Sequence, residues 1–140
     1  MLRAVLDTNV LVAGMRSVRG ASFELLRLLD TKIWAVVLSN TLLTEYQEVL
    51  HREQPALPYS HQEIEKALDN LCVRAEQWHL RNRWLPMLPD PDDEAMVHLA
   101  VESGADYIIT HNVRHVEPAR ELGVRVVTPG EFLRKLRKEL

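Results

Sequence analysis

Short apolar runs alternate along the chain with longer stretches that have helical periodicity. The runs at residues 2–6, 33–38, 107–110 and 124–127 have the length and composition of β-strands. Residues 8–14 are predicted to form a loop after the first strand, and residues 78–88 an irregular stretch. Helices are predicted at residues 22–29, from residue 39 to about 53, over 61–77, from residue 90 to about 104, at 118–122, and from residue 129 to the end.

This alternation of strands and helices is typical of βαβ units with a parallel sheet. The run at 33–38, IWAVVL, is apolar throughout, as expected of a strand covered on both faces. We therefore predict a single domain over residues 1–140, an α/β/α three-layer sandwich around a parallel sheet of about four to five strands.

Ligands of such sheets bind beyond the carboxyl ends of the strands. Asp7 directly follows the first strand, and Thr110 and Asn112 follow the third. Asp106 precedes the third strand and is expected at the opposite end of the sheet. Alone, Asp7 could equally cap the turn that follows it.

The helix from residue 39 carries two glutamates whose positions differ. At about 100° per residue, its apolar stripe leaves Glu48 on the opposite, solvent side and Glu45 on the flank. Ser39, Asn40 and Thr41 offer capping groups for this helix. Glu45 is thus predicted to reach toward Asp7, and Glu48 to be a surface charge.

A dense acidic cluster precedes the third strand, at Asp90, Asp92, Asp93 and Glu94. Helix capping explains part of it, because Asp90 fits an N-cap position and acids favour the first helical turn. In the helix that follows, Asp93 lies on the side predicted to be buried and Asp92 on its flank. Asp93 is therefore the acid predicted to point at the sheet edge.

Like charges gathered at one point need a counter-charge. Oxygen ligands without cysteine favour a hard cation, so we predict Mg²⁺ or Mn²⁺ bound by Asp7, Glu45 and Asp93. Such an ion activates water and neutralises charge in phosphoryl transfer.

Composition restricts the class of protein. The chain has 20 Asp plus Glu against 17 Lys plus Arg, a net charge of −3, and 46% apolar residues. No apolar run is long enough to span a membrane, no signal peptide is evident, and the single Cys72 cannot form an internal disulfide, so a cytoplasmic protein is expected. Asp7, Glu45 and Asp93 together equal the whole excess of acids.

The chain resembles a PIN-domain ribonuclease of the small prokaryotic type, often the toxin of a type II toxin–antitoxin pair. The resemblance rests on four motifs in order, VLDTNVLVAG (5–14), SNTLLTEYQEVL (39–50), DPDDEAMVHLAVESGADYIITHN (90–112) and TPGEFL (128–133).

The resemblance implies hydrolysis of single-stranded RNA to a 5′-phosphate and a 3′-hydroxyl, with Asp7, Glu45, Asp93 and Asn112 as the catalytic residues. Many members of the family have Asp where this chain has Asn112, and Asp92 could compensate. It also implies a homodimer and an antitoxin protein as partners. The supporting residues are Asn9, which would tie the loop to the site, Thr110, Asp92, and a cationic rim for RNA at Arg16, Arg19, Arg114 and His115.

Other functions remain open at this stage. A haloacid-dehalogenase-like phosphatase would need an acid where Asn9 stands, and a receiver domain would need a lysine after a late strand, whereas residues 84–113 contain no Lys or Arg. A PIN-like module that binds RNA or a partner protein and cleaves weakly or not at all is the stronger alternative, because Asn112 is neutral.

Overall fold

The computed structural model describes residues 1–80 and 91–139, with side chains in the second range described from residue 93 on. Within these residues the chain forms one five-stranded parallel sheet of order β3-β2-β1-β4-β5. This confirms the predicted α/β sandwich and parallel sheet. The strands are β1 (Leu2–Leu6), β2 (Trp34–Ser39), β3 (Glu76–Trp78), β4 (Tyr107–Ile109) and β5 (Arg125–Val127).

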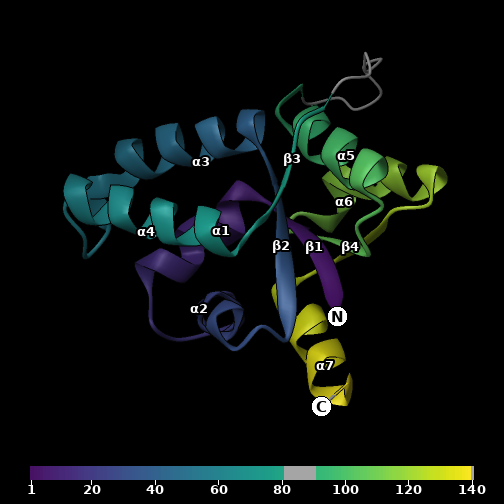
Figure 1. Cartoon of the computed structure of the whole chain (residues 1–140), viewed down its shortest axis with the longest axis horizontal. Coiled ribbons are helices and arrows are strands. Elements are labelled where there is room, and N and C mark those ends of the chain that lie inside the picture. The colour runs from purple at the N-terminus through teal and green to yellow at the C-terminus, as the bar shows by residue number, and fades with distance from the viewer. Residues whose placement is uncertain (81–90, 140) are drawn as a thin grey trace.

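The helices cover both faces of this sheet. Figure 1 shows α1 to α4 on one side of the central strands and α5 on the other. The α-helices are α1 (Thr8–Arg16), α2 (Ala21–Leu28), α3 (Asn40–Glu53), α4 (His61–Arg74), α5 (Pro91–Ser103), α6 (Val113–Val116) and α7 (Pro129–Glu139), and the 3₁₀ turns are η1 (Leu29–Thr31), η2 (Gln54–Ala56) and η3 (Glu117–Leu122). None of the helices in the described part of the chain is long and apolar enough to cross a membrane.

The strand order creates a switch point between β1 and β4. From β1 the chain passes to β2 on one side, and it later returns to β4 on the other. Leu6 pairs with Ile109, so both strands end at the same level and the Asp7 N–H donates to the Ile109 carbonyl at 2.9 Å. Asp7 and Thr110 are therefore adjacent at the carboxyl edge, where open α/β sheets bind ligands.

Two predictions about elements were wrong. Residues 8–14 are not a loop, because the chain enters α1 directly after Asp7. Glu76 and Gln77, at the end of the predicted helix 61–77, form the edge strand β3 together with Trp78, the first residue of the predicted irregular stretch. The tripeptide EQW has no apolar run to mark it as a strand, and only its pairing with β2, Val37 opposite Glu76, makes it one. Asp90, most of the predicted irregular stretch 78–88, and the Asp92 side chain lie outside the described residues.

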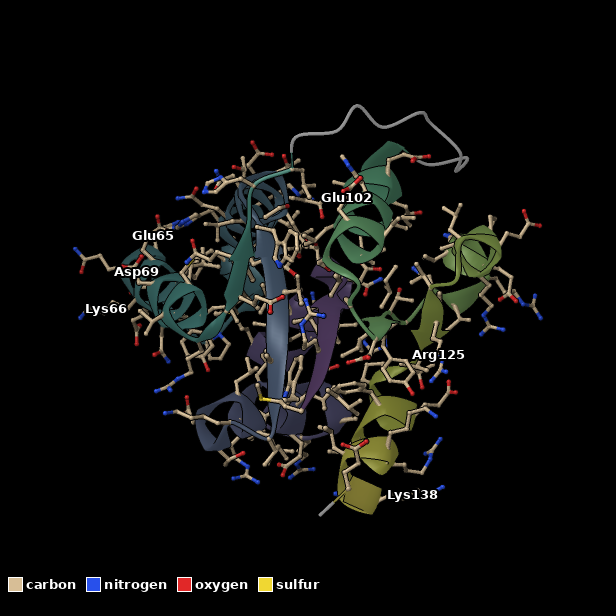
Figure 2. All side chains as sticks on the ribbon, turned by 45° about the vertical axis from the view of Figure 1, so that its right-hand side comes forward. Glu65, Lys66, Asp69, Glu102, Arg125 and Lys138 are labelled. Carbon is tan, nitrogen blue, oxygen red and sulfur yellow. The ribbon has the colours of Figure 1, made fainter. Side chains whose placement is uncertain are left out.

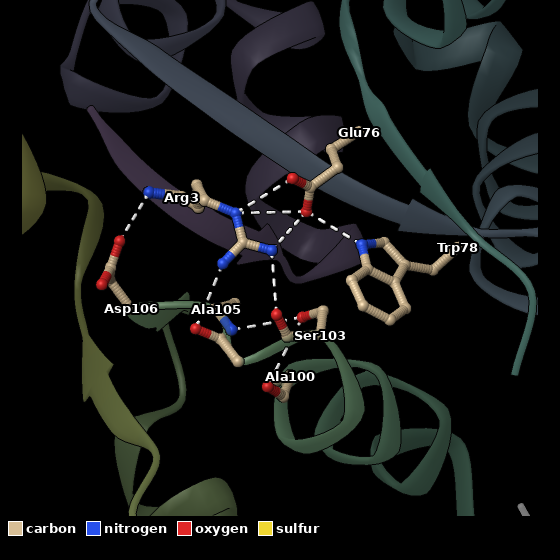
Figure 3. A network of polar contacts seen from close by, with 8 residues as sticks. Arg3, Glu76, Trp78, Ala100, Ser103, Ala105 and Asp106 are labelled. Atoms are coloured by element: carbon tan, nitrogen blue, oxygen red, sulfur yellow. Dashed lines mark hydrogen bonds and ion pairs between the residues drawn. The ribbon is translucent and has the colours of Figure 1, made fainter.

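The amino edge of the sheet holds a polar network around Arg3 (Figure 3). The Arg3 Nε donates to both Glu76 carboxylate oxygens at 3.1 Å, and its Nη2 donates to the Ser103 carbonyl at 2.9 Å. Its backbone N–H donates to Asp106 at 2.8 Å, which confirms that Asp106 lies away from the carboxyl edge. This network connects β1, β3 and the turn between α5 and β4.

Candidate active site

A cavity of about 530 Å³ lies at the carboxyl edge of the sheet, over the ends of β1 and β4. We call it the carboxylate cavity because four acids contribute to its wall, one directly after β1, two from α3 and one from α5. Its lining residues are Asp7, Thr8, Asn9, Val12, Ala13, Arg16, Glu45, Val49, Glu53, Asp93, Met96, His111, Asn112 and His115.

Asp7 is fixed at the base of this cavity by β4. The Thr110 hydroxyl donates to Asp7 Oδ2 at 2.6 Å, and the same hydroxyl oxygen accepts the Asn112 N–H at 3.0 Å. Thr110 is completely buried, so its hydroxyl cannot bond to solvent water instead. The T-x-N sequence after β4 thus holds the Asp7 carboxylate in place while it turns the chain so that Asn112 lines the cavity.

Burial raises the pKa of the Asp7 carboxyl above its ordinary value of 3.8. The hydrogen bond from Thr110, the N–H groups of Asn9 and Thr8 and the charge of His111 act in the opposite direction and do not offset burial. An ionised Asp7 is therefore in an unfavourable setting until a cation or a further donor joins it.

Glu45 comes from α3, which begins where Ser39 accepts the Leu42 N–H at 3.2 Å. The Glu45 carboxylate accepts a hydrogen bond from the hydroxyl of Thr8, the residue after Asp7. Glu48 is exposed, as predicted from its position opposite the apolar stripe. The structure therefore separates the two glutamates as the periodicity did.

Tyr46 determines how close α3 lies to the end of β1. Its side chain is fully buried and its hydroxyl donates to the Leu6 carbonyl. Burial raises the pKa of this phenol well above 10, and the nearby charges of Asp7 and Glu45 raise it further. Tyr46 thus stays protonated and acts as a fixed donor. In the sequence Tyr46 is one position of the apolar stripe of its helix, and nothing there marks its hydroxyl as a donor to β1.

Asp93 and Asn9 complete the oxygen-rich wall. Asp93 lies in the first turn of α5, on the face that lines the cavity, while Ala100 further along this helix is buried in the core. The side-chain amide oxygen of Asn9, Oδ1, is buried and has no hydrogen-bond partner among the described residues. A buried acceptor without a donor is costly, and it suits a cation or a ligand N–H.

The donor set matches a hard divalent cation in chemistry. Carboxylate and amide oxygens line the cavity, and cysteine is absent from its described wall. In the described residues no three Asp, Glu, His or Cys side chains surround one point closely enough to hold a metal ion together. Thr8 and Thr110 bind two of the carboxylates instead.

The predicted cationic rim is divided. Arg16, at the end of α1, and His115, in α6, line the carboxylate cavity, and Arg16 Nη2 lies 3.6 Å from the carboxylate of Glu53. Arg19 lies in the loop before α2, outside this cavity, and Arg114 is exposed and also outside it. Thr8, Tyr46 and Glu53 are members of the site that sequence reasoning missed.

Comparison with known proteins identifies the family. The family model described as "PIN domain" matches residues 3–114, about four-fifths of the chain. The chain belongs to the PIN domain family. The matched region contains every residue of the carboxylate cavity except His115.

A solved structure with the same fold supports the architecture. A chain of VapBC2 from Rickettsia felis, crystallised bound to a DNA fragment from their promoter, superposes with a TM-score of 0.59 at 14% identity. The match covers 89% of this PIN domain and 97% of that chain. No curated protein matches the sequence. PIN domains are generally nucleases, so the family makes this chain a member of a hydrolase family.

Proposed function

We propose that this PIN domain is a metal-dependent endoribonuclease that hydrolyses phosphodiester bonds of single-stranded RNA in the carboxylate cavity. The observation that carries the proposal is that Asp7, Glu45, Asp93 and Asn112, from four separate segments, line one cavity at the switch point of the sheet. A cavity of this size admits a nucleotide and its phosphate, and its acids suit an ion that phosphate would share.

Asp7, Asp93 and Glu45 would hold Mg²⁺ or Mn²⁺, with Asn9 and Asn112 as neutral oxygen donors nearby. The bound ion supplies a Lewis acid for the phosphate and lowers the pKa of water. The protein supplies the orientation. Thr110 holds Asp7, Thr8 holds Glu45, and the Tyr46 hydroxyl fixes the distance between the two elements. Arg16 and His115 at the rim offer donors to phosphate oxygens.

Cleavage assays with paired variants of α3 test this function. We expect labelled single-stranded RNA to be cut with Mn²⁺ or Mg²⁺ and to survive in EDTA. Glu45→Gln should lower the rate at least about 100-fold, as loss of a metal-site or transition-state carboxylate does. Glu48→Gln removes the same charge from the exposed face of the same helix and should leave the rate unchanged. Equal effects of the two substitutions would contradict the proposal.

Metal binding is tested separately by calorimetry. Mn²⁺ should bind the wild-type protein, and Asp93→Asn should weaken that binding. The same affinity in both proteins would remove Asp93 from the metal site.

A second candidate function is a PIN-like module that binds RNA or a partner protein without efficient cleavage. It is favoured by Asn112, a neutral side chain in the wall of the cavity. The cleavage rates of the wild type and of Asn112→Asp distinguish the two functions. If Asn112→Asp raises cleavage by tenfold or more from a barely measurable wild-type rate, the chain is the weak module, whereas a small change supports the nuclease.

The resemblance to toxins adds a cellular role to the proposal. We propose a cytoplasmic toxin that forms a homodimer and is inhibited by an antitoxin protein bound over the cavity. Induced expression should then arrest growth, and Asp7→Asn should abolish the arrest. Co-expression of a small DNA-binding protein encoded beside this gene should also relieve the arrest. Light scattering tests the homodimer, and a measured mass equal to that of one chain would contradict it.

A further inference from the structure

A second hollow, of about 440 Å³, lies beside the carboxylate cavity. We call it the arginine hollow. It is formed by the end of α1, the loop and first turn of α2, the residue after Thr110, and the first turn of α7. Its lining residues are Ala13, Arg16, Ser17, Arg19, Gly20, Ala21, Ser22, His111, Thr128, Pro129 and Gly130.

The two depressions differ in charge. The described wall of the carboxylate cavity includes Asp7, Glu45, Glu53 and Asp93, whereas the described lining of the arginine hollow includes no acid. Glu131, next to Gly130, is outside this lining, and its carboxylate accepts the Thr128 hydroxyl at 3.0 Å.

Three residues belong to both depressions, Ala13, Arg16 and His111, so the two are continuous. Arg16 is about half exposed and lies 3.6 Å from Glu53 on the side of the carboxylate cavity. Its remaining N–H groups can donate hydrogen bonds to a ligand that extends from one depression into the other. His111 Nε2 lies 3.5 Å from the Ser22 hydroxyl, so the imidazole spans from the end of β4 to α2.

Arg19 is the cation that belongs to the arginine hollow alone. It is exposed, and its guanidinium has no ion-pair partner among the described residues. Its backbone N–H donates to the Ser17 hydroxyl at 3.1 Å, which fixes the loop. The hollow also includes the first residues of α2 and the start of α7, whose N–H groups add partial positive charge.

We propose that the arginine hollow binds a backbone phosphate of the RNA strand, adjacent to the phosphate held in the carboxylate cavity. The proposal rests on the proposed function. A strand carries one negative charge per nucleotide, so the phosphate next to the one in the carboxylate cavity needs cationic donors, and the arginine hollow offers them without an acid in its described lining. Arg19, Arg16 and His111 supply donors to phosphate oxygens, and no base edge needs to be read.

Salt dependence of RNA binding measures this contact. A fluorescein-labelled single-stranded RNA 12-mer is titrated in EDTA, so that it is not cut, and anisotropy gives the dissociation constant at several salt concentrations. Arg19→Gln should weaken binding about three- to tenfold and reduce the slope of log K against log salt by about 0.7. Arg19→Lys keeps the charge and should retain the slope.

Arg125→Gln is the matched control. Arg125 begins β5 at the amino edge of the sheet and is exposed (Figure 2). Loss of this charge should leave the slope unchanged. If Arg19→Gln and Arg125→Gln give the same slope as each other, the hollow holds no phosphate.

A neutral linkage locates the phosphate along the strand. A series of 12-mers carries one methylphosphonate each, at successive positions. One position next to the cleaved linkage should weaken binding to the wild-type protein, and the same substitution should have no further effect on Arg19→Gln. Effects that add at every position would overturn the proposal.

These measurements separate the two proposals. A wild-type protein that neither binds nor cleaves RNA contradicts the proposed function. A wild-type protein that binds and cleaves, with Arg19→Gln behaving as Arg125→Gln does, contradicts only the phosphate site. Capture of a protein partner that depends on Arg19, with no change in RNA binding, would also overturn it.

Discussion

At the scale of single residues, Asp7 is the group whose surroundings matter most. It ends a buried strand, accepts the Thr110 hydroxyl at 2.6 Å, and has a pKa raised chiefly by burial. A carboxylate placed in this way weakens the fold when it is ionised and gains most from a cation. The same feature that suits it to bind metal should therefore cost the metal-free protein stability.

Asp7→Asn should make the metal-free protein more stable at neutral pH. A carboxyl whose folded pKa exceeds its unfolded value of about 3.8 binds its proton more tightly in the folded state. The wild-type protein thus loses stability as pH rises through that raised pKa, and the Asn variant does not. Urea unfolding in EDTA should show a higher free energy of unfolding for Asp7→Asn at pH 7 and a smaller difference at pH 3. A less stable variant at pH 7 would contradict this reasoning.

Thr110→Val should distinguish the effect of the Thr110 hydroxyl from the effect of its side-chain volume. The hydroxyl is buried, donates to Asp7 and accepts from the Asn112 N–H, and valine removes both bonds at similar volume. We expect a loss of about 1–3 kcal/mol in the free energy of unfolding, and a fall of about 10- to 100-fold in cleavage, as for other residues that orient metal ligands. Thr110→Ser keeps the hydroxyl and should restore most of the cleavage rate, and failure to do so would indicate a packing role only.

At the scale of elements, α1 connects the two depressions. It begins directly after Asp7, places Asn9 and Ala13 in the carboxylate cavity, and ends at Arg16, between the cavity and the arginine hollow. Gly14 lets α1 pack closely against α2, because a Cβ on it would lie 2.5 Å from Leu26 Cδ1 and 3.1 Å from the Ser22 carbonyl oxygen. This glycine therefore reflects helix packing, although it ends the segment 8–14 that was predicted to be a loop.

Gly14→Ala should therefore destabilise the protein although alanine favours helices. Leu26 can rotate away, but the Ser22 carbonyl is backbone in the first turn of α2, so the helices must separate. We expect a loss of about 1–3 kcal/mol in thermal or urea unfolding, the usual cost of overpacking. Gly130→Ala, where the nearest atom to the new Cβ is Arg134 Nη1 at 3.8 Å, is the control and should be nearly neutral. A stabilised Gly14→Ala protein would show that α1 and α2 are not closely packed.

The elements that sequence predicted are those with strong local patterns. The apolar strand β2 and the helix α3, with its Ser39 cap and its two differently placed glutamates, are visible in periodicity alone. The edge strand β3 is stabilised by pairing with β2 and by the ion pair of Glu76 with Arg3, both with distant partners. Contacts with residues distant in the sequence leave no local pattern, so β3 could not be predicted from periodicity.

The candidate site also has a part that could be predicted from the sequence and a part that could not. Asp7 and Asn112 could be placed because residues that follow parallel strands meet at one edge. Thr8, which donates to Glu45, and Tyr46, which donates to the Leu6 carbonyl, could not be predicted, since both have ordinary roles in a local pattern. No local pattern relates His51 to His61, yet η2 and the turn after it bring their Nδ1 atoms within 2.7 Å, because α3 and α4 pack side by side.

At the scale of the whole molecule, the two ends of the sheet have opposite electrostatic characters. The carboxyl edge gathers Asp7, Glu45, Glu53 and Asp93 in the wall of one cavity, where Arg16 pairs with Glu53. The amino edge pairs its charges, with Arg3 bound to Glu76 and to carbonyls of the turn after α5. The paired charges of the amino edge thus stabilise the fold at the end of the sheet remote from the cavity.

Arg3→Met should weaken the fold without altering the chemistry of the cavity. It removes the contacts that join β1, β3 and the α5–β4 turn, and because the pair is partly exposed we expect a loss of only about 1–3 kcal/mol. The hydrogen bond from Arg3 lowers the pKa of Glu76, so this stabilisation is present above the ordinary carboxyl pKa of 4.5 and is lost as pH falls through the lowered value. The stability difference between wild type and Arg3→Met should therefore shrink from pH 7 to pH 3 in urea unfolding. Cleavage per folded molecule should be unchanged, and a large fall in that rate would mean that the amino edge also shapes the cavity.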